Sequence, residues 1–139
     1  MNATTPPLRP GMTAGYFNSR STDHLPGLVG LEVLLVEPGK LESRLQVRKA
    51  LMAPNGFLHA ASVVALADTS CGYACVAHLP EGASGFTTLE LKANFLGTTR
   101  EGAILCRAVP AHLGRTTQVW EAEVVVEGTG KRMALFRCT

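Results

Sequence analysis

The sequence predicts an α+β domain in which one long helix packs against an antiparallel β-sheet. Residues 59–78 form the only long segment with helical spacing of apolar residues, and six other segments show the alternating or continuously apolar pattern of strands. Turn residues separate these segments, which gives the order β-β-α-β-β-β-β. A helix of about 20 residues, rising ~1.5 Å per residue, is long enough to cross the face of such a sheet.

The first two predicted strands form a hairpin that follows an N-terminal arm. Residues 1–27 are rich in Pro, Thr, Gly and Ser, so we expect an arm with one short helix, followed by a single domain over residues 28–139. Residues 28–37 are apolar enough for a mostly buried strand, and Pro38-Gly39 suits a tight turn. Residues 41–47 then alternate between apolar and polar side chains and complete the hairpin.

A loop leads into the predicted helix, and four strands follow it. The helix contains many small residues, which favours close packing against a sheet, and Pro80 and Gly82 end it. Pro110 implies a sheet edge or a bulge in the second of the four strands. These strands are predicted at residues 87–96, 103–112, 117–127 and 131–139.

The composition is that of an ordinary globular protein. The 139 residues are enough for one domain with a substantial core, with 46% hydrophobic and 17% charged residues. A net charge of +2 with scattered Lys and Arg argues against a nucleic-acid-binding surface. The longest apolar run is interrupted by Asp68, so we expect no membrane span, and the N-terminus lacks a secretion signal pattern. The cysteines lack C-x-x-C spacing and predict reduced, buried thiols in a cytoplasmic protein: Cys71, Cys75, Cys106 and Cys138.

Asp68 is the strongest candidate for chemistry because it interrupts the apolar helix. A carboxylate among Ala, Val and Leu residues costs stability unless it is solvated, paired or functional. Burial would raise its pKa, which suits a general base near neutral pH. The alternative is a structural acid at a subunit interface or beside a group that it caps. The hydroxyl of Thr69 could hydrogen-bond to Asp68 or to a bound water, and the alternative is the more common bond of a helical hydroxyl back to the backbone.

The helix start carries His59 and Ala60, preceded by a turn at Asn55-Gly56. Free N–H groups at a helix start, reinforced by the helix dipole, can hold an oxyanion, and Gly56 lets the backbone approach a ligand closely. An ordinary Asn-Gly turn and a structural histidine are the alternatives. His59 and Asp68 are 68 − 59 = 9 residues apart, which is roughly 13 Å along a helix and about 180° around it. If both serve one site, they come from different subunits, or His59 lies off the helix.

Two further places are candidates for ligand binding. Gly114-Arg115-Thr116 opens a predicted strand with a cation and a hydroxyl that suit a phosphate, and a hairpin loop with a solvated arginine is the alternative. Lys92, on the outer face of its strand, offers a second contact. Cys71 and Cys75 lie one helical turn apart, but no matching ligand pair occurs elsewhere in the sequence. We therefore expect them to be core residues and predict no metal site.

Together these residues resemble the hotdog-fold thioesterases and, within them, the PaaI-like group of the phenylacetate-degradation type. The resemblance rests on Gly56-x-x-His59 followed by Leu66-Ala67-Asp68-Thr69, and on the strand at residues 88–95, Gly114-Arg115 and the closing segment 134–137. It implies one long central helix wrapped by a curved antiparallel sheet. It also implies homodimers, often paired into homotetramers, with active sites at the dimer interface and no cofactor.

The resemblance further implies hydrolysis of an acyl-CoA thioester. In such enzymes the acid at the position of Asp68 acts as a general base on water or as a nucleophile. The N–H at the position of Ala60 polarises the thioester carbonyl, and His59 positions the substrate. Arg115 and its neighbours would meet the CoA phosphates. The acyl group that the resemblance favours is small or aromatic.

This chain departs from the family pattern in two places. The helix start is often His-Gly-Gly, but here it is His59-Ala60-Ala61, which keeps the N–H groups and adds methyl groups. The amide that often stands six residues before the histidine is replaced by Ala53, and Asn55 is the residue available for that role. Two other functions stay open on the sequence alone: a hotdog hydratase or dehydratase, and an acyl-CoA-binding domain without turnover.

Overall fold

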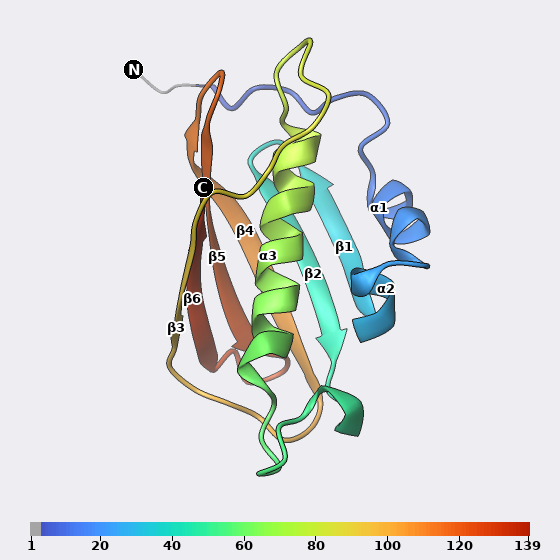
Figure 1. The fold of residues 1–139 in the computed structure, drawn as a ribbon, viewed down its shortest axis with the longest axis vertical. Coiled ribbons are helices and arrows are strands. Elements are labelled where there is room, and N and C mark those ends of the chain that lie inside the picture. The colour runs from blue at the N-terminus through green and yellow to red at the C-terminus, as the bar shows by residue number, and fades with distance from the viewer. Residues whose placement is uncertain (1–3) are drawn as a thin grey trace.

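An 18-residue helix, α3 (Ala60–Ala77), lies along one face of a curved six-stranded antiparallel sheet in the computed structural model, which describes residues 4–139 (Figure 1). The strands are β1 (Leu31–Glu37), β2 (Lys40–Gln46), β3 (Leu91–Phe95), β4 (Ala103–Leu113), β5 (Gln118–Val126) and β6 (Arg132–Cys138). Their order in the sheet is β1-β2-β4-β5-β6-β3, so β1 and β3 are the edges. The predicted α+β fold, with its helix between the second and third strands, is confirmed.

The alternation in β2 places three side chains between the sheet and α3. Leu41, Ser43 and Leu45 are completely buried. The Ser43 hydroxyl hydrogen-bonds to the Ser70 hydroxyl of α3, with 2.6 Å between the oxygens, which satisfies both buried polar groups. The residues between them face the opposite surface of the sheet, where Arg44 pairs with Glu127.

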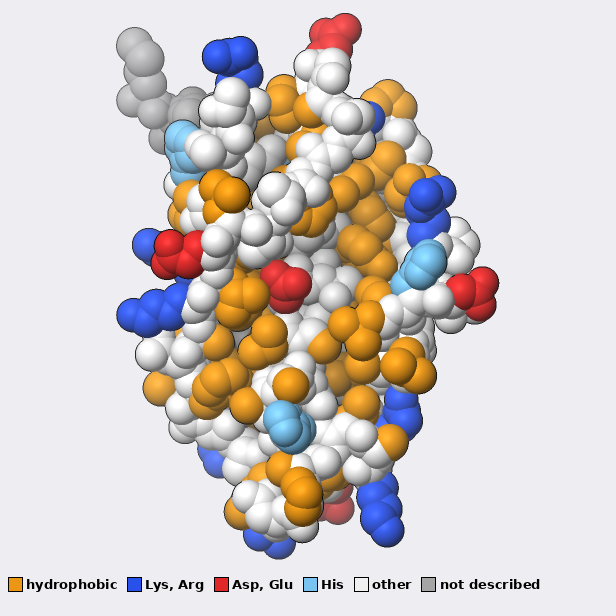
Figure 2. Space-filling model, viewed as in Figure 1, with side chains coloured by type: hydrophobic (Ala, Val, Ile, Leu, Met, Phe, Trp, Pro, Cys, Tyr) orange, Lys and Arg blue, Asp and Glu red, His pale blue; other side chains and the backbone are white. Residues whose placement is uncertain are grey.

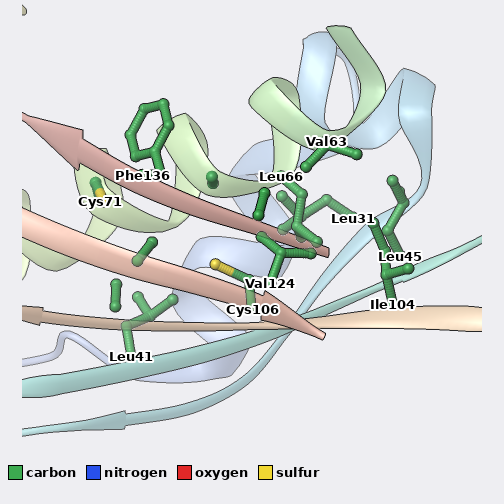
Figure 3. Packing of buried hydrophobic residues seen from close by; sticks show 14 of the residues in the cluster. Leu31, Leu41, Leu45, Val63, Leu66, Cys71, Ile104, Cys106, Val124 and Phe136 are labelled. Atoms are coloured by element: carbon green, nitrogen blue, oxygen red, sulfur yellow. The ribbon is translucent and has the colours of Figure 1, made fainter. Parts of the chain in front are cut away.

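Small residues let α3 approach the sheet closely. Ala67, Cys71 and Ala74 are at most 1% exposed. Leu66 packs with Val124 and other strand residues in the same layer (Figure 3). By length and hydropathy alone α3 could cross a membrane, but it packs on the sheet as the core helix of the domain does. All four cysteines are buried and unpaired, as predicted.

The prediction of a strand beginning at Leu28 is wrong, because residues 25–29 form helix α2 (Leu25–Val29). Pro26 lies in the first turn of α2, where its missing N–H costs nothing, and Gly30 ends the helix with φ of 82°. β1 therefore starts at Leu31, and the predicted boundary between arm and domain lies inside α2.

The N-terminal segment packs on the sheet and helix through α1 (Ala14–Ser21). The ring of Phe17 is 2% exposed and stacks on Tyr73 of α3 with 4.6 Å between ring centres. The amide of Asn18 donates to the Val33 carbonyl at 2.9 Å and accepts from its N–H at 2.8 Å. A short 3-10 turn, η1 (Lys49–Leu51), lies within the loop that precedes α3.

Candidate active site

Asp68 lies in the middle of α3, on a side of the helix that the sheet covers only in part. It is the only acidic residue of that helix, and Figure 2 shows a single acidic side chain over α3 with hydrophobic side chains around it. Desolvation raises the pKa of the Asp68 carboxyl above its usual value, because burial penalises the charged form. A hydrogen bond from Cys138 acts in the opposite direction and lowers the pKa by less.

The contacts of Asp68 leave one of its oxygens available. The Cys138 thiol donates to Oδ1, with the sulfur 3.8 Å from the oxygen. Among residues 4–139, no Lys or Arg side chain forms an ion pair with Asp68, and no group donates to Oδ2. Thr69, the next residue, is partly exposed beside it. Among the residues that the structure describes, Asp68 is therefore neither half of a salt bridge nor a cap, which removes two structural explanations for a carboxylate in an apolar helix.

The start of α3 presents two hydrogen-bond donors. His59 is the N-cap residue, and its Nδ1 accepts the Ala61 N–H at 2.9 Å. That bond places the ring proton of a neutral His59 on Nε2, which is then a donor in an exposed position. The Ser62 N–H bonds to the His59 carbonyl at 2.9 Å. In the described part of the chain the Ala60 N–H has no acceptor, so it remains free at the positive end of the helix dipole.

A tight turn fixes the approach to this helix start. Met52 and Leu58 form an isolated β-bridge, and Gly56 turns the chain between them with φ of 85°. The Asn55 side-chain oxygen accepts the Phe57 N–H at 3.2 Å. The structure therefore gives Asn55, at the exposed tip of the turn, a local role in shaping the loop.

One chain does not bring His59 and Asp68 together. His59 lies at the N-cap of α3 and Asp68 in its middle, so they are roughly 13 Å apart along the helix axis. His59 lies just outside α3 as its N-cap, with an extended backbone, and its ring stays at the helix start because Nδ1 accepts the Ala61 N–H.

The residues predicted to bind phosphate line a pocket of about 210 Å³ near the C-terminal end of α3. Gly114, Arg115 and Thr116 form the turn between β4 and β5 and share this pocket with Cys75 and other residues. A Cβ at position 114 would lie 2.8 Å from the backbone carbonyl oxygen of Thr117, so the turn requires glycine. Cys75 lies on the same stripe of α3 as Asp68, about 10 Å further along.

Lys92 lies on the other side of the sheet. Its neighbour Ala93 pairs with Phe136 of the core, so strand alternation turns Lys92 outward. There it lines a pocket of about 670 Å³ with charged residues that include Arg137 and Glu121. Lys92 therefore lies on the outer face of its strand, as expected from the sequence, and one chain does not bring it to Asp68.

The buried cysteines are not suited to nucleophilic attack. Burial raises the pKa of Cys75 to about 11 and that of Cys106 to about 12, so their thiols stay protonated near neutral pH. Within residues 4–139, no group of three His, Cys, Asp or Glu side chains is placed to hold a metal ion. Asp68 is then the titratable group in this region with both a raised pKa and a free oxygen.

The sequence did not reveal two neighbours of this site. Cys138 contacts Asp68 from the end of the last strand, and the Phe86 ring lies over Gly72, one helical turn beyond Asp68. Alternation in β6 predicts that Cys138 faces the helix, but not which helical residue it meets. Phe86 lies in an irregular segment that carries no periodic signal.

The profile of one protein family, described as the thioesterase superfamily, matches residues 55–133, a range that contains the helix start, Asp68 and Arg115. The chain belongs to the thioesterase superfamily. The 1,4-dihydroxy-2-naphthoyl-CoA hydrolase of Listeria monocytogenes is 32% identical over 111 residues, which are 80% of this chain and 89% of that protein.

Solved structures of other thioesterases agree with this assignment. A thioesterase from Haemophilus influenzae superposes with a TM-score of 0.85 at 30% identity, covering 91% of this chain and 87% of that one. A mutant thioesterase from Pseudomonas aeruginosa gives a TM-score of 0.89 at 26% identity, covering 96% and 95%. The fold of this thioesterase is therefore the hotdog fold, and its family is one of thioester hydrolases.

Proposed function

We propose that this thioesterase hydrolyses an acyl-CoA to a free acid and CoA, and that Asp68 is its catalytic acid residue. The observation that carries the proposal is the environment of Asp68, whose pKa is raised by burial and whose Oδ2 has no donor within residues 4–139. The Listeria relative is named for a CoA thioester of an aromatic acid. That name, together with the family, supports a CoA ester of a small or aromatic acyl group as the substrate.

Two routes use the same groups. In the first, Oδ2 of Asp68 takes a proton from water as the water oxygen adds to the thioester carbonyl carbon. In the second, Oδ2 adds to that carbon itself, and water hydrolyses the resulting anhydride. In both routes the C–S bond breaks and CoA leaves as a thiolate that takes up a proton. The carbonyl oxygen gains negative charge, for which the Ala60 N–H and the His59 Nε2–H are the available donors.

The free edge of the sheet supports a dimer as the active unit. In the described part of the chain β3 pairs with β6 alone, and residues in β3 or within two positions of it expose a row of apolar side chains. They are between 43% and 71% exposed: Leu89, Leu91, Phe95 and Leu96. An uncovered apolar edge strand is a site for pairing with another chain. A second copy of the chain is the occupant we propose, because the two halves of the site otherwise remain apart.

The register of β3 determines which residues of the two subunits would lie at the same level in such a dimer. Leu91 pairs with Cys138, which contacts Asp68, so Leu91 lies level with Asp68. β3 runs opposite to α3 (Figure 1), so Ala93 lies about 6.6 Å nearer the helix start at ~3.3 Å per residue. The midpoint between Asp68 and His59 is also about 6.7 Å from Asp68. A two-fold axis at Ala93 would therefore bring the partner subunit's His59 to the level of Asp68.

The pocket at the β4–β5 turn supports a place for CoA. Arg115 and Thr116 in its lining suit phosphate oxygens, and Cys75 and Phe86 in the same lining suit the methylene and methyl groups of the thin, uncharged pantetheine arm. Because Cys75 follows Asp68 along one face of α3, the arm would run along the helix from the thioester to the turn.

A thiol-release assay over a panel of acyl-CoAs tests the function. We expect thiol release for at least one small or aromatic acyl-CoA, and a loss of roughly 10²-fold or more in kcat for Asp68→Asn with acyl-CoA binding retained. A wild-type protein that binds acyl-CoAs without releasing thiol would be a binding domain. Conversion of the acyl chain with the thioester intact would identify a hydratase. An unchanged rate in Asp68→Asn would remove Asp68 from the mechanism.

A further inference from the structure

The thiol of Cys138 approaches the carboxylate of Asp68 from the end of β6. Its sulfur lies 3.8 Å from Oδ1, and the residue is only 8% exposed. Cys138 is held in place from both sides, because it pairs with Leu91 of β3 and with Trp120 of β5. A side chain fixed by two neighbouring strands is a rigid support for a group on the helix that crosses them.

We propose that Cys138 is a positioning residue for catalysis: its thiol holds Oδ1 of Asp68 and leaves Oδ2 directed to the reacting water or carbonyl. This inference rests on the proposed function, in which Asp68 reacts. A free aspartate side chain can rotate about both its bonds and exchange its two oxygens. A single donor on one oxygen makes the two oxygens different and limits that rotation.

The weakness of a thiol as a donor suits this role. A hydroxyl or a cation would stabilise the carboxylate more strongly and lower the pKa of Asp68, which would make it a weaker base. Burial and the nearby Asp68 charge raise the pKa of Cys138, so the thiol keeps its proton and remains a donor. The arrangement therefore orients the carboxylate at a small cost in basicity.

Cys106 offers a matched control. It is also a buried thiol on an inner face of the sheet, 2% exposed, but its neighbours are Ser43 and Ser70 rather than Asp68. Removing its sulfur deletes the same atom from the same core without touching the proposed site. The comparison of Cys138→Ala with Cys106→Ala separates positioning from packing.

The test combines steady-state hydrolysis, its pH profile and a 13C NMR titration of the Asp68 carboxyl, all on the full chain. We expect Cys138→Ala to lower kcat about tenfold with little change in KM, since misplacing a reacting group costs rate rather than binding. In Cys138→Ala the pKa of Asp68 should rise, because a donor to the carboxylate is lost. The acidic limb of the pH profile of kcat/KM should therefore shift to higher pH. Cys138→Ser should restore kcat to within about threefold and move both to lower pH. Cys106→Ala should leave the pH profile and the titration unchanged.

Three results would overturn the inference. They are a wild-type kcat and pH profile in Cys138→Ala, a folded Cys138→Ser that fails to restore kcat, and an equal loss in Cys106→Ala. Failure of the proposed function would look different, because the wild-type protein itself would then release no thiol from any acyl-CoA. In that case the NMR titration alone tests the contact between Cys138 and Asp68. An Asp68 pKa that is the same in wild type and Cys138→Ala would exclude the hydrogen bond.

Discussion

Two variants of this chain that each lack one residue of the proposed site should regain hydrolytic activity when they are combined in one dimer. Asp68→Asn removes the reacting carboxylate, and His59→Asn removes the imidazole while keeping a good N-cap for α3. In the proposed dimer each site takes Asp68 from one chain and His59 from the other. A mixed dimer of the two variants therefore has one site with both residues and one site with neither.

The expected recovery follows from this geometry. Random pairing of equal amounts makes half of the dimers mixed, and half of the sites in those dimers are complete. The mixture should then show about a quarter of the wild-type activity, well above either variant alone. Co-expression with two different tags and tandem purification isolates the mixed dimer, whose activity should rise to about half of wild type.

The measurement is thiol release by the mixture, compared with the mean of the two variants measured separately. A matched control mixes Asp68→Asn with Asp68→Ala, in which every site lacks the carboxylate and no recovery is expected. If the mixed dimer of Asp68→Asn and His59→Asn shows only the mean of its parents, the two residues do not serve one site across an interface. The proposal of a divided site would then be wrong.

Further predictions concern the pocket, the helix and a buried histidine. Arg115→Ala should raise KM for acyl-CoAs but barely affect esters of a short thiol without the nucleotide, and equal effects on both would contradict a phosphate contact. In Gly72→Ala the new methyl would come 3.0 Å from the Phe86 ring, which is 46% exposed and can move. We expect an unfolding midpoint no lower than wild type, because Ala favours the helix by about 0.5–1 kcal/mol, with a changed ratio of kcat/KM between aromatic and short acyl-CoAs. Burial lowers the pKa of His78, whose Nε2 accepts the Gly39 N–H at 2.8 Å, so stability should fall as the pH drops below about 6.5. Urea midpoints at pH 7.5 and 5.5 measure this, and His78→Gln should flatten the dependence.

The fold was predictable where local signals agreed with one another. The Pro38-Gly39 turn, the alternation of β2 and the apolar spacing of α3 each indicate the element that the structure contains. The start of β1 was not predicted, because Leu28 and Val29 are apolar in a way that fits either a strand or a short helical turn. Pro26 and Gly30, at the two ends of α2, were the signals that decide for the helix.

The candidate site was predictable only as far as one segment carries it. The turn at Gly56, the cap at His59 and the acid at Asp68 lie within a few turns of chain, so their spacing could be read directly. The contact of Asp68 with Cys138 joins residues 70 positions apart. It depends on the register of β6 against its neighbours and on the crossing of α3 over the sheet, neither of which a local pattern specifies.

An active site shared between two subunits also satisfies two opposed electrostatic requirements, one for the carbonyl oxygen and one for the carboxylate. A carbonyl oxygen that gains negative charge is best held by a helix N-terminus, but a carboxylate placed in that first turn would be stabilised in its charged form and would be a weak base. The dipole effect falls off beyond the first turn, so the middle of α3, at Asp68, keeps the carboxyl basic. Both features then lie on one helix and too far apart to act together. An antiparallel pair of such helices would place the acid of each opposite the free N–H group of the other, with the thioester carbonyl between them. The nine residues from His59 to Asp68 are thus what makes two chains necessary in the proposed mechanism, and also what keeps the base of one chain from being neutralised by its own helix.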